Sequence, residues 1–306
     1  GETLTPVAKH LAKKIKGVKF VPAIFGEEVL IAREKMVAGD ILILENLRTD
    51  IGEKSNDSLF AKTLAGMAEI FVSDAFSASH RKHASIVGIP KYLPSYAGLQ
   101  LFEEIKHLSK ILKPRHPFVF ILGGAKISTK LPLLKSYKDK ADTLFVGGAV
   151  ANDFFLARGF EVGTSLVDDT VVPKNILSAK SLFIPIDIIT DSHQVKLSEK
   201  VGKRDRILDA GPATVAVMTE KIKKAKLVLM NGPLGDYEHG FAGGTEALLK
   251  AMVASSAITI VGGGDSVATV QKMKLEKKLT FVSTGGGAML EYLAKGTLPG
   301  IQALKK

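Results

Sequence analysis

The sequence predicts an α/β protein in which parallel strands alternate with helices. Apolar runs of four or five residues recur between segments with helical spacing, and five of these runs end in glycine-rich turns that open helices. Buried parallel strands are typically continuous apolar runs, and each needs a crossover, usually helical, to reach the next. The 306 residues suffice for about two domains.

The first third of the chain shows this alternation in short elements. A helix begins at Thr5 and Pro6, which suit the N-cap and the first helical position, and its apolar stripe reaches Ile15. The pattern then predicts a strand, a helix, a strand, a helix and a strand at 18–21, 27–36, 40–44, 57–67 and 69–73. Residues 99–112 have helical spacing, and Pro114 ends that helix.

Beyond Pro117 the alternation becomes more regular. Short apolar strands are predicted at 118–122, 143–146, 227–230, 258–261 and 279–282. The helix at 99–113 therefore joins two α/β lobes. We expect a first lobe at 1–98, a second at 114–292, and a carboxy-terminal segment, 293–306, that returns to the first.

Composition and charge exclude several classes of protein. The chain has no cysteine, so a disulfide framework, a thiol nucleophile and an iron–sulfur cluster are out. The net charge of +11 favours anionic ligands, but the lysine runs lack interleaved aromatic residues and are typical of solvated helix faces. No apolar run approaches the ~20 residues of a membrane span, and no signal peptide is evident. We therefore expect a cytoplasmic protein without nucleic-acid or membrane partners.

The glycine-rich turns predict a phosphate-binding edge of the sheet. They lie at 123–126, 147–148, 231–233, 262–265 and 283–287. The carboxyl ends of parallel strands meet at one edge, where the unpaired N–H groups of helix N-termini attract anions. The alternative is that these glycines only make tight turns. Neither GxxxxGK[ST] nor GxGxxG occurs, which weighs against a P-loop and a dinucleotide fold.

Three charged side chains accompany these turns. Lys126 and Lys130 are spaced i and i+4 where a helix is expected to begin, so both ammonium groups can reach one phosphate. Asp265 stands at a glycine-rich helix start, where a carboxylate can hold Mg²⁺ against phosphate or, alternatively, cap the helix.

A basic cluster follows two strands of the first lobe. Arg48 comes after the strand at 40–44, and His80, Arg81 and His83 come after the strand at 69–73. These side chains suit a second anion, a substrate carboxylate or phosphate. The alternative is a solvated loop. No third ligand is spaced to make the histidine pair a metal site.

Ten short motifs occur along the whole chain in a characteristic order. They are Leu-Glu-Asn-Leu-Arg at 44–48, Ser-Asp-Ala-Phe at 73–76, His-Arg-x-His at 80–83, Gly-Gly-Ala-Lys at 123–126, Gly-Thr-Ser at 163–165, Asp-x-Gly-Pro at 209–212, Asn-Gly-Pro at 231–233, Gly-Gly-Gly-Asp at 262–265, Ser-Thr-Gly-Gly-Gly at 283–287 and Leu-Pro-Gly at 298–300. In these motifs the chain resembles the phosphoglycerate kinase family.

The resemblance implies two Rossmann-like parallel-sheet lobes joined by a hinge helix. It also implies a monomeric glycolytic enzyme that transfers a phosphoryl group reversibly between 1,3-bisphosphoglycerate and ADP, giving 3-phosphoglycerate and ATP, with Mg²⁺. By position, phosphoglycerate would be held by Arg48, His80, Arg81 and His83, and catalysis would involve Lys126, Gly285 and Gly286. The implied nucleotide site comprises Gly124, Ala125, Lys126, Lys130, Gly147, Gly148, Asn231, Pro233, Glu238, Gly263, Gly264, Asp265 and Ser266, with Asp265 as the metal ligand.

Departures from the family pattern leave other hypotheses open. The family normally begins with about seventy further residues that carry Arg-x-Asp-x-Asn and His-Leu-Gly-Arg-Pro, including a catalytic arginine, and we expect that segment to be lacking here. Thr129 stands where the family commonly has Asp. The chain is then an enzyme, or a truncated, non-catalytic Mg-nucleotide-binding module of the same ancestry. A different α/β phosphotransferase or a dinucleotide oxidoreductase is a weaker alternative.

Overall fold

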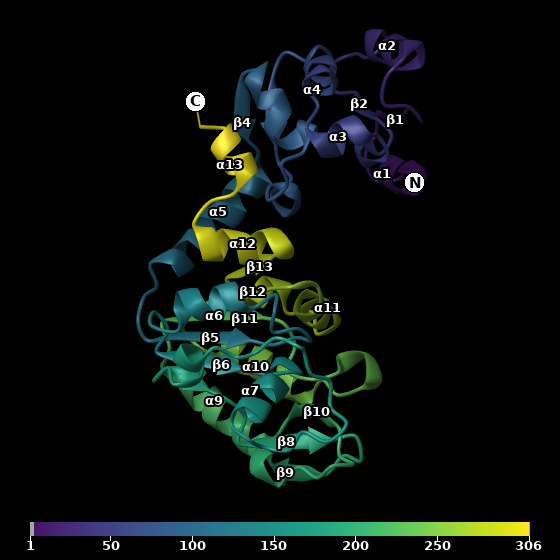
Figure 1. Ribbon diagram of the computed structural model, residues 1–306. Coiled ribbons are helices and arrows are strands. Elements are labelled where there is room, and N and C mark those ends of the chain that lie inside the picture. The colour runs from purple at the N-terminus through teal and green to yellow at the C-terminus, as the bar shows by residue number, and fades with distance from the viewer. Residues whose placement is uncertain (1–2, 306) are drawn as a thin grey trace. The chain divides into compact units, whose positions relative to one another are not determined.

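The computed structural model describes residues 3–305 and divides into two units (Figure 1). Of the described residues, 3–73, 81–97 and 299–305 form the first unit, and Asp74–His80 and Gly98–Leu298 form the second. Both contain parallel sheets, so the predicted α/β class is confirmed. The boundaries predicted for the two lobes, 1–98 and 114–292, remain a prediction of which parts fold independently. No helix within residues 3–305 is long and apolar enough to cross a membrane.

The first unit is built from short elements around two separate two-stranded parallel sheets, β1–β2 and β3–β4. Its elements are α1 (Thr5–Ala12), β1 (Val18–Phe20), α2 (Glu27–Glu34), β2 (Ile41–Ile43), α3 (Ile51–Ser55), α4 (Ser58–Ala65), β3 (Phe71–Ser73), β4 (Ser95–Ala97) and α13 (Pro299–Ala303). A small core forms around α4, where Phe60 contacts Phe25 edge to face at a centroid distance of 5.0 Å. Every predicted element of residues 5–73 is present, while α3 and β4 were missed.

The second unit has a six-stranded parallel sheet in the order β13-β12-β11-β5-β6-β7. The strands are β5 (Phe118–Leu122), β6 (Thr143–Val146), β7 (Leu182–Phe183), β11 (Leu227–Asn231), β12 (Ile258–Gly262) and β13 (Phe281–Ser283). The helices are α5 (Leu99–Leu112), α6 (Leu131–Tyr137), α7 (Val150–Ala157), α8 (Lys174–Leu177), α9 (Pro212–Lys224), α10 (Gly243–Ala254), α11 (Gly264–Lys272) and α12 (Gly287–Lys295).

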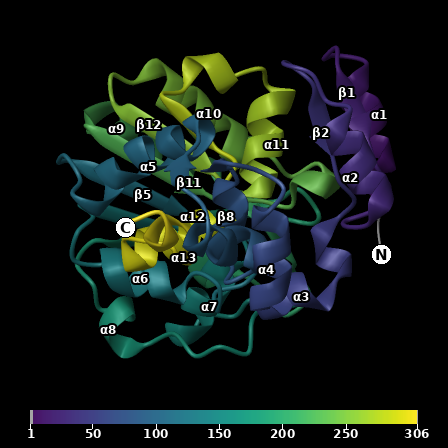
Figure 2. The same cartoon turned by 90° about the horizontal axis from the view of Figure 1, so that it is seen from above.

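The core of the second unit lies on both faces of this sheet. Figure 2 shows α9, α10 and α11 along one side and α6 and α7 along the other. Alternate residues of β5 divide between the faces: Val119 and Ile121 join the cluster under α9 and α10, whereas Phe118 and Phe120 contact the ring of Tyr137 in α6. Every residue of β5, β6 and β11 is buried, as continuous apolar runs predict.

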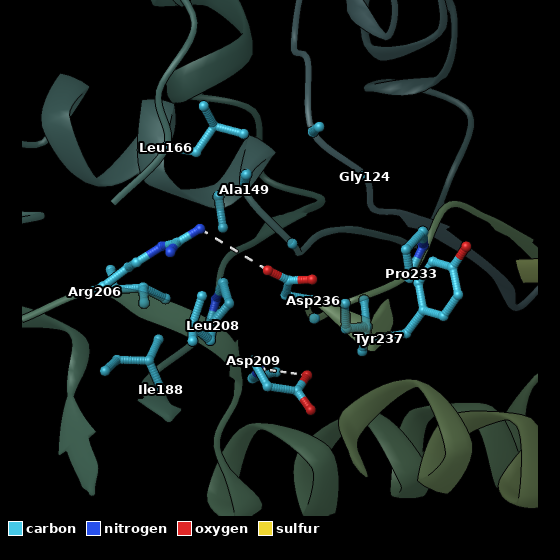
Figure 3. Close-up of a pocket in the computed structure, with 18 of the residues that line it drawn as sticks. Gly124, Ala149, Leu166, Ile188, Arg206, Leu208, Asp209, Pro233, Asp236 and Tyr237 are labelled. Atoms are coloured by element: carbon cyan, nitrogen blue, oxygen red, sulfur yellow. Dashed lines mark hydrogen bonds and ion pairs between the residues drawn. The ribbon is translucent and has the colours of Figure 1, made fainter. Parts of the chain in front are cut away.

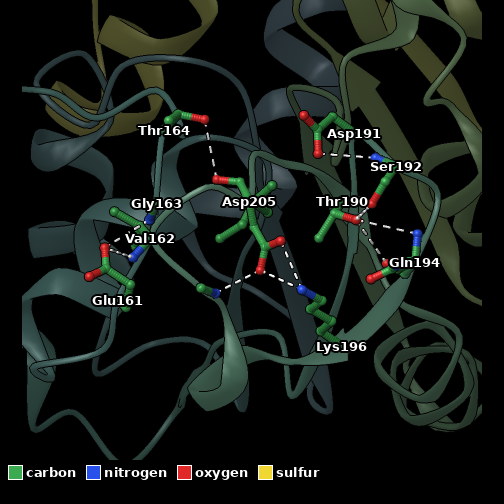
Figure 4. A network of polar contacts seen from close by, with 12 residues as sticks. Glu161, Val162, Gly163, Thr164, Thr190, Asp191, Ser192, Gln194, Lys196 and Asp205 are labelled. Atoms are coloured by element: carbon green, nitrogen blue, oxygen red, sulfur yellow. Dashed lines mark hydrogen bonds and ion pairs between the residues drawn. The ribbon is translucent and has the colours of Figure 1, made fainter.

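A second, three-stranded antiparallel sheet was not predicted. It consists of β8 (Asp187–Thr190), β9 (Val195–Leu197) and β10 (Ile207–Ala210) in the order β10-β8-β9. The loop before β10 is held by Asp205, whose carboxylate accepts hydrogen bonds from the Gly202 amide at 2.6 Å and from Lys196 Nζ at 2.7 Å (Figure 4). This loop leads to Arg206 and Ile207, which line an apolar cavity described below.

Candidate functional site

Five predicted glycine-rich turns lie at one edge of the six-stranded sheet. They follow β5, β6, β11, β12 and β13, which are parallel, so the predicted common edge is confirmed. The turns after β5 and β6 each approach the turn after β11 so closely that only glycine fits. A Cβ at Gly123 would lie 2.1 Å from the Pro233 carbonyl oxygen, and a Cβ at Gly148, where φ is +62°, would lie 2.7 Å from the same oxygen.

Charged side chains from separate turns meet in a cavity of about 290 Å³ at this edge. The cavity is lined by Gly124, Ala125, Lys126, Thr129, Lys130, Asn231, Gly232, Pro233, Gly263, Gly264 and Asp265. Two lysines, the backbone N–H groups of glycine-rich turns and one carboxylate suit a polyphosphate with a bound cation.

Lys130 is the buried cation of this cavity. Its side chain is only slightly exposed, and its Nζ donates a hydrogen bond to Asn231 Oδ1. Burial lowers the pKa of Lys130 to about 8, and the nearby charge of Asp265 opposes that shift. The ammonium form therefore predominates at pH 7, where it can neutralise phosphate charge.

The helical spacing predicted for the two lysines is wrong. Helix α6 begins at Leu131 with Pro132 in its first turn, so Lys126 and Lys130 lie in the preceding turn. Proline favours the first turn because its fixed φ suits the helix and no N–H is needed there. That turn is held by the Lys130 amide, which donates to the Ile127 carbonyl at 2.8 Å. Both lysines nevertheless line the same cavity.

Asp265 is available to hold a cation. It lies in the first turn of α11, but the N-cap position is Gly263 and no side chain caps the helix, so the capping alternative is wrong. Its Oδ1 lies 3.5 Å from the Tyr237 hydroxyl, a long contact that leaves the carboxylate oxygens accessible. An exposed carboxylate beside a phosphate-sized cavity fits Mg²⁺, which commonly takes one or two protein carboxylates together with phosphate oxygens.

A second cavity of about 290 Å³ adjoins the first and has a mainly apolar lining (Figure 3). The two cavities share Gly124, Ala125, Pro233 and Asp265. The remaining lining includes the predicted residues Gly148 and Glu238 and the apolar side chains of Phe155, Leu166, Pro185, Ile188, Leu208 and Leu234. A polar end continuous with an apolar slot matches the shape and chemistry of a nucleotide.

Four of the residues predicted for nucleotide binding or catalysis lie outside both cavities. Gly147 and Ser266 are buried beside them, in the turn after β6 and in the first turn of α11. Gly285 and Gly286 lie in the turn between β13 and α12. That turn is anchored by Glu104 of α5, a fully buried carboxylate that accepts hydrogen bonds from Ser283 Oγ at 2.7 Å and the Thr284 amide at 2.9 Å.

In the first unit a buried carboxylate organises the predicted basic cluster. Glu53 Oε1 lies 3.5 Å from His83 Nδ1, and Glu53 also accepts hydrogen bonds from the amide and hydroxyl of Ser85. The pKa of His83 is lowered, chiefly by burial; the charges of Arg48 and Arg81 add to that shift, and Glu53 opposes it. Arg48, Arg81 and His83 thus form one electrostatic cluster. His80 belongs to the second unit.

Several residues of these sites were missed from the sequence. Glu53 and Glu104 act from helices far along the chain from their partners, and no local pattern marks them. Arg206 and Asp236 line the apolar cavity from two different loops. The signal for Asp236 was its place two residues before Glu238, while Arg206 carried none.

Comparisons with known proteins agree with these observations. The sequence profile of the family described as "Phosphoglycerate kinase" matches residues 2–296. A phosphoglycerate kinase of Pseudothermotoga lettingae is 43% identical over 99% of this chain and 81% of the relative. The corresponding protein of Herpetosiphon aurantiacus is 42% identical over 98% of this chain and 81% of the relative.

Solved structures give the same result. The phosphoglycerate kinase of Coxiella burnetii aligns with a TM-score of 0.83 and 36% identity over 99% of this chain and 80% of that structure. The enzyme of Pyrococcus horikoshii aligns with a TM-score of 0.85 and 29% identity over 99% of this chain and 82% of that structure.

Proposed function

The chain belongs to the phosphoglycerate kinase family, and we propose that it transfers a phosphoryl group reversibly between 1,3-bisphosphoglycerate and ADP. In that reaction the bond from phosphorus to the carboxyl oxygen breaks while a bond to a terminal ADP phosphate oxygen forms. The observation that carries the proposal is the convergence of Lys126, Lys130 and Asp265 in one cavity that continues into an apolar slot.

Phosphoryl transfer depends mainly on positioning and on neutralising charge. Lys130, charged below its pKa of about 8 and oriented by Asn231, would bind the nucleotide phosphates. The exposed Lys126 would reach the transferring group, and the backbone amides of Gly285 and Gly286 would stabilise its oxygens. Asp265 would hold Mg²⁺, which neutralises phosphate charge when bound.

The phosphoglycerate substrate is proposed to bind to the basic residues. Guanidinium groups suit carboxylate and phosphate because their planar donors match both anions. We therefore assign phosphoglycerate to Arg48 and Arg81 with His80 and His83. Each of these ligands is a small molecule, so we propose that a monomer suffices, which sedimentation of the purified chain with both substrates tests.

The test of this function is turnover of ATP with 3-phosphoglycerate and Mg²⁺. We expect activity in this chain that falls by about 10²-fold or more in Lys126→Ala, because a transition-state charge contact is lost. Lys135→Ala is the matched control, since Lys135 is an exposed lysine of α6 outside both cavities. Calorimetric binding of Mg-ADP without turnover would instead support the non-catalytic nucleotide-binding module.

A further inference from the structure

We propose that Arg206 and Asp236 form a base-reading pair in the apolar cavity that selects 6-aminopurine over 6-oxopurine nucleotides. This inference rests on the proposed function and deepens it by assigning specificity for the base. The two side chains come from different loops of the second unit and point toward each other in Figure 3.

The position of the pair places it at the base end of the cavity. The phosphate end is marked by Lys126 and Lys130, which line only the polar cavity. Arg206 and Asp236 line only the apolar cavity, together with side chains such as Leu166 and Leu208. A nucleotide with its phosphates at the lysines would extend its base into this apolar part, where charged groups need a polar partner.

The geometry of the pair leaves hydrogen-bonding capacity for a ligand. Arg206 Nη2 lies 3.9 Å from Asp236 Oδ2, which is longer than a hydrogen bond. The side chains are 50% and 27% exposed, so neither is sealed in the protein. The other carboxylate oxygen, Oδ1, is 2.9 Å from His239 Nδ1. Oδ2 and the guanidinium therefore keep hydrogen-bonding capacity for a planar base edge that contacts both groups side by side.

The backbone fixes both residues in place. The Asp236 amide donates to the Leu208 carbonyl at 2.9 Å, which ties its loop to β10. The Arg206 carbonyl accepts from the Asp191 amide at 2.9 Å. The preceding residue, Asp205, is anchored by Gly202 and Lys196 (Figure 4). Two opposite charges are thus held at defined positions on anchored loops, as a recognition site requires.

The order of the hydrogen-bond donor and acceptor in this pair then determines which base the site prefers. Adenine presents an amino donor at position 6 beside the acceptor N1, whereas hypoxanthine presents an oxygen acceptor beside an N1–H donor. Carboxylate is only an acceptor and guanidinium only a donor. With the amino group at Asp236 and N1 at Arg206, adenine is matched and hypoxanthine is opposed at both contacts. A site that pairs with one polar edge disfavours the reversed edge, because donor then faces donor, acceptor faces acceptor and both hydrogen bonds are lost.

The experiment is calorimetric binding of ADP and IDP, which differ only in this edge. We expect the unaltered chain to bind ADP roughly tenfold more tightly than IDP. In Asp236→Asn and in Arg206→Gln the preference should shrink to less than about threefold, because an amide can reorient to donate or accept. IDP affinity should hold or rise in these variants, which also shows that they are folded.

The control variant is Arg204→Gln, which removes the same charge from an exposed position two residues away. It should keep the full ADP preference. Equal affinity of the unaltered chain for ADP and IDP would overturn the base-reading pair while leaving the kinase proposal intact. An unchanged preference in both variants, or an equal loss of both ligands, would also overturn it. Binding of neither nucleotide by the unaltered chain would refute the proposed nucleotide site itself.

Discussion

At the scale of single residues, the candidate site depends on ionisable groups whose protonation the fold controls. Lys130 is buried against Asn231, and this burial destabilises its ammonium form relative to the same group in water. Lys126, four residues earlier, is exposed. The two lysines are therefore not equivalent, although their sequence spacing made them look like a matched pair. We therefore expect the buried lysine to make ligand binding depend on pH.

We predict that ADP affinity falls as the pH rises through about 8, where the pKa of Lys130 lies. Deprotonation removes a phosphate-neutralising charge, so the loss should approach about tenfold per pH unit above that pKa. Calorimetry without Mg²⁺ at pH 7.5 to 9.5 measures it. In Lys130→Met, binding should be weaker and nearly independent of pH; an equally steep dependence in that variant would assign the titration to another group.

The lowered pKa of Lys130 has the opposite effect on the stability of the fold. The pKa of Lys130 is lowered from 10.5 to about 8 in the fold. The unfolded chain therefore binds more protons than the folded chain between these values. The contribution of this residue to the free energy of unfolding must rise as the pH increases across that window, even while ADP affinity falls.

At the scale of elements, the turns after the parallel strands carry most of the geometry. The turn between β6 and α7 is a clear case, because Gly148 combines a φ of +62° with a Cβ position 2.7 Å from the Pro233 carbonyl oxygen. Gly159, after α7, has a φ of +80° but open space where a Cβ would lie. Comparing substitutions at Gly148 and Gly159 therefore separates the energetic cost of backbone strain from the cost of steric crowding.

We predict that Gly148→Ala destabilises the fold by at least about 1 kcal/mol more than Gly159→Ala. Both substitutions strain a left-handed backbone, but only the first forces two neighbouring turns apart. Gly148→Ala should also weaken ADP binding, since Gly148 and Pro233 both line the apolar cavity. Thermal unfolding and calorimetry of the two variants measure these effects. Equal destabilisation would show that backbone strain alone sets the cost.

The elements also show what the sequence could predict. The bounds of α5, β5 and β6 match the prediction, because long apolar runs and strict helical spacing dominate there. The antiparallel strands β8, β9 and β10 were missed because no α-helix separates them, so they do not follow the strand–helix alternation that identified the other strands. The phosphate edge could be predicted from the glycine-rich turns, because the carboxyl ends of parallel strands meet at one edge of a sheet. The Arg206–Asp236 pair did not, since only the folded loops bring these residues together.

At the scale of the whole molecule, the chain combines two units that differ in the size of their sheets and cores. The first has two separate two-stranded sheets and a small core around α4, and the second has a six-stranded sheet with helices on both faces. Sheets of two strands are only marginally stable without further packing. All residues that line the two cavities belong to the second unit.

We therefore predict that thermal unfolding occurs in two steps, with the first unit unfolding at the lower temperature. A ligand stabilises only the part that binds it, so ADP at a hundred times its dissociation constant should stabilise the second unit by about 2.7 kcal/mol. The lower transition should stay where it is. Scanning calorimetry with and without ADP distinguishes the steps, and hydrogen exchange assigns them to residues. A single transition that moves as a whole would mean that the two units unfold as one cooperative body, in which case nucleotide binding in the second unit would stabilise the residues of the first unit that we propose to bind phosphoglycerate.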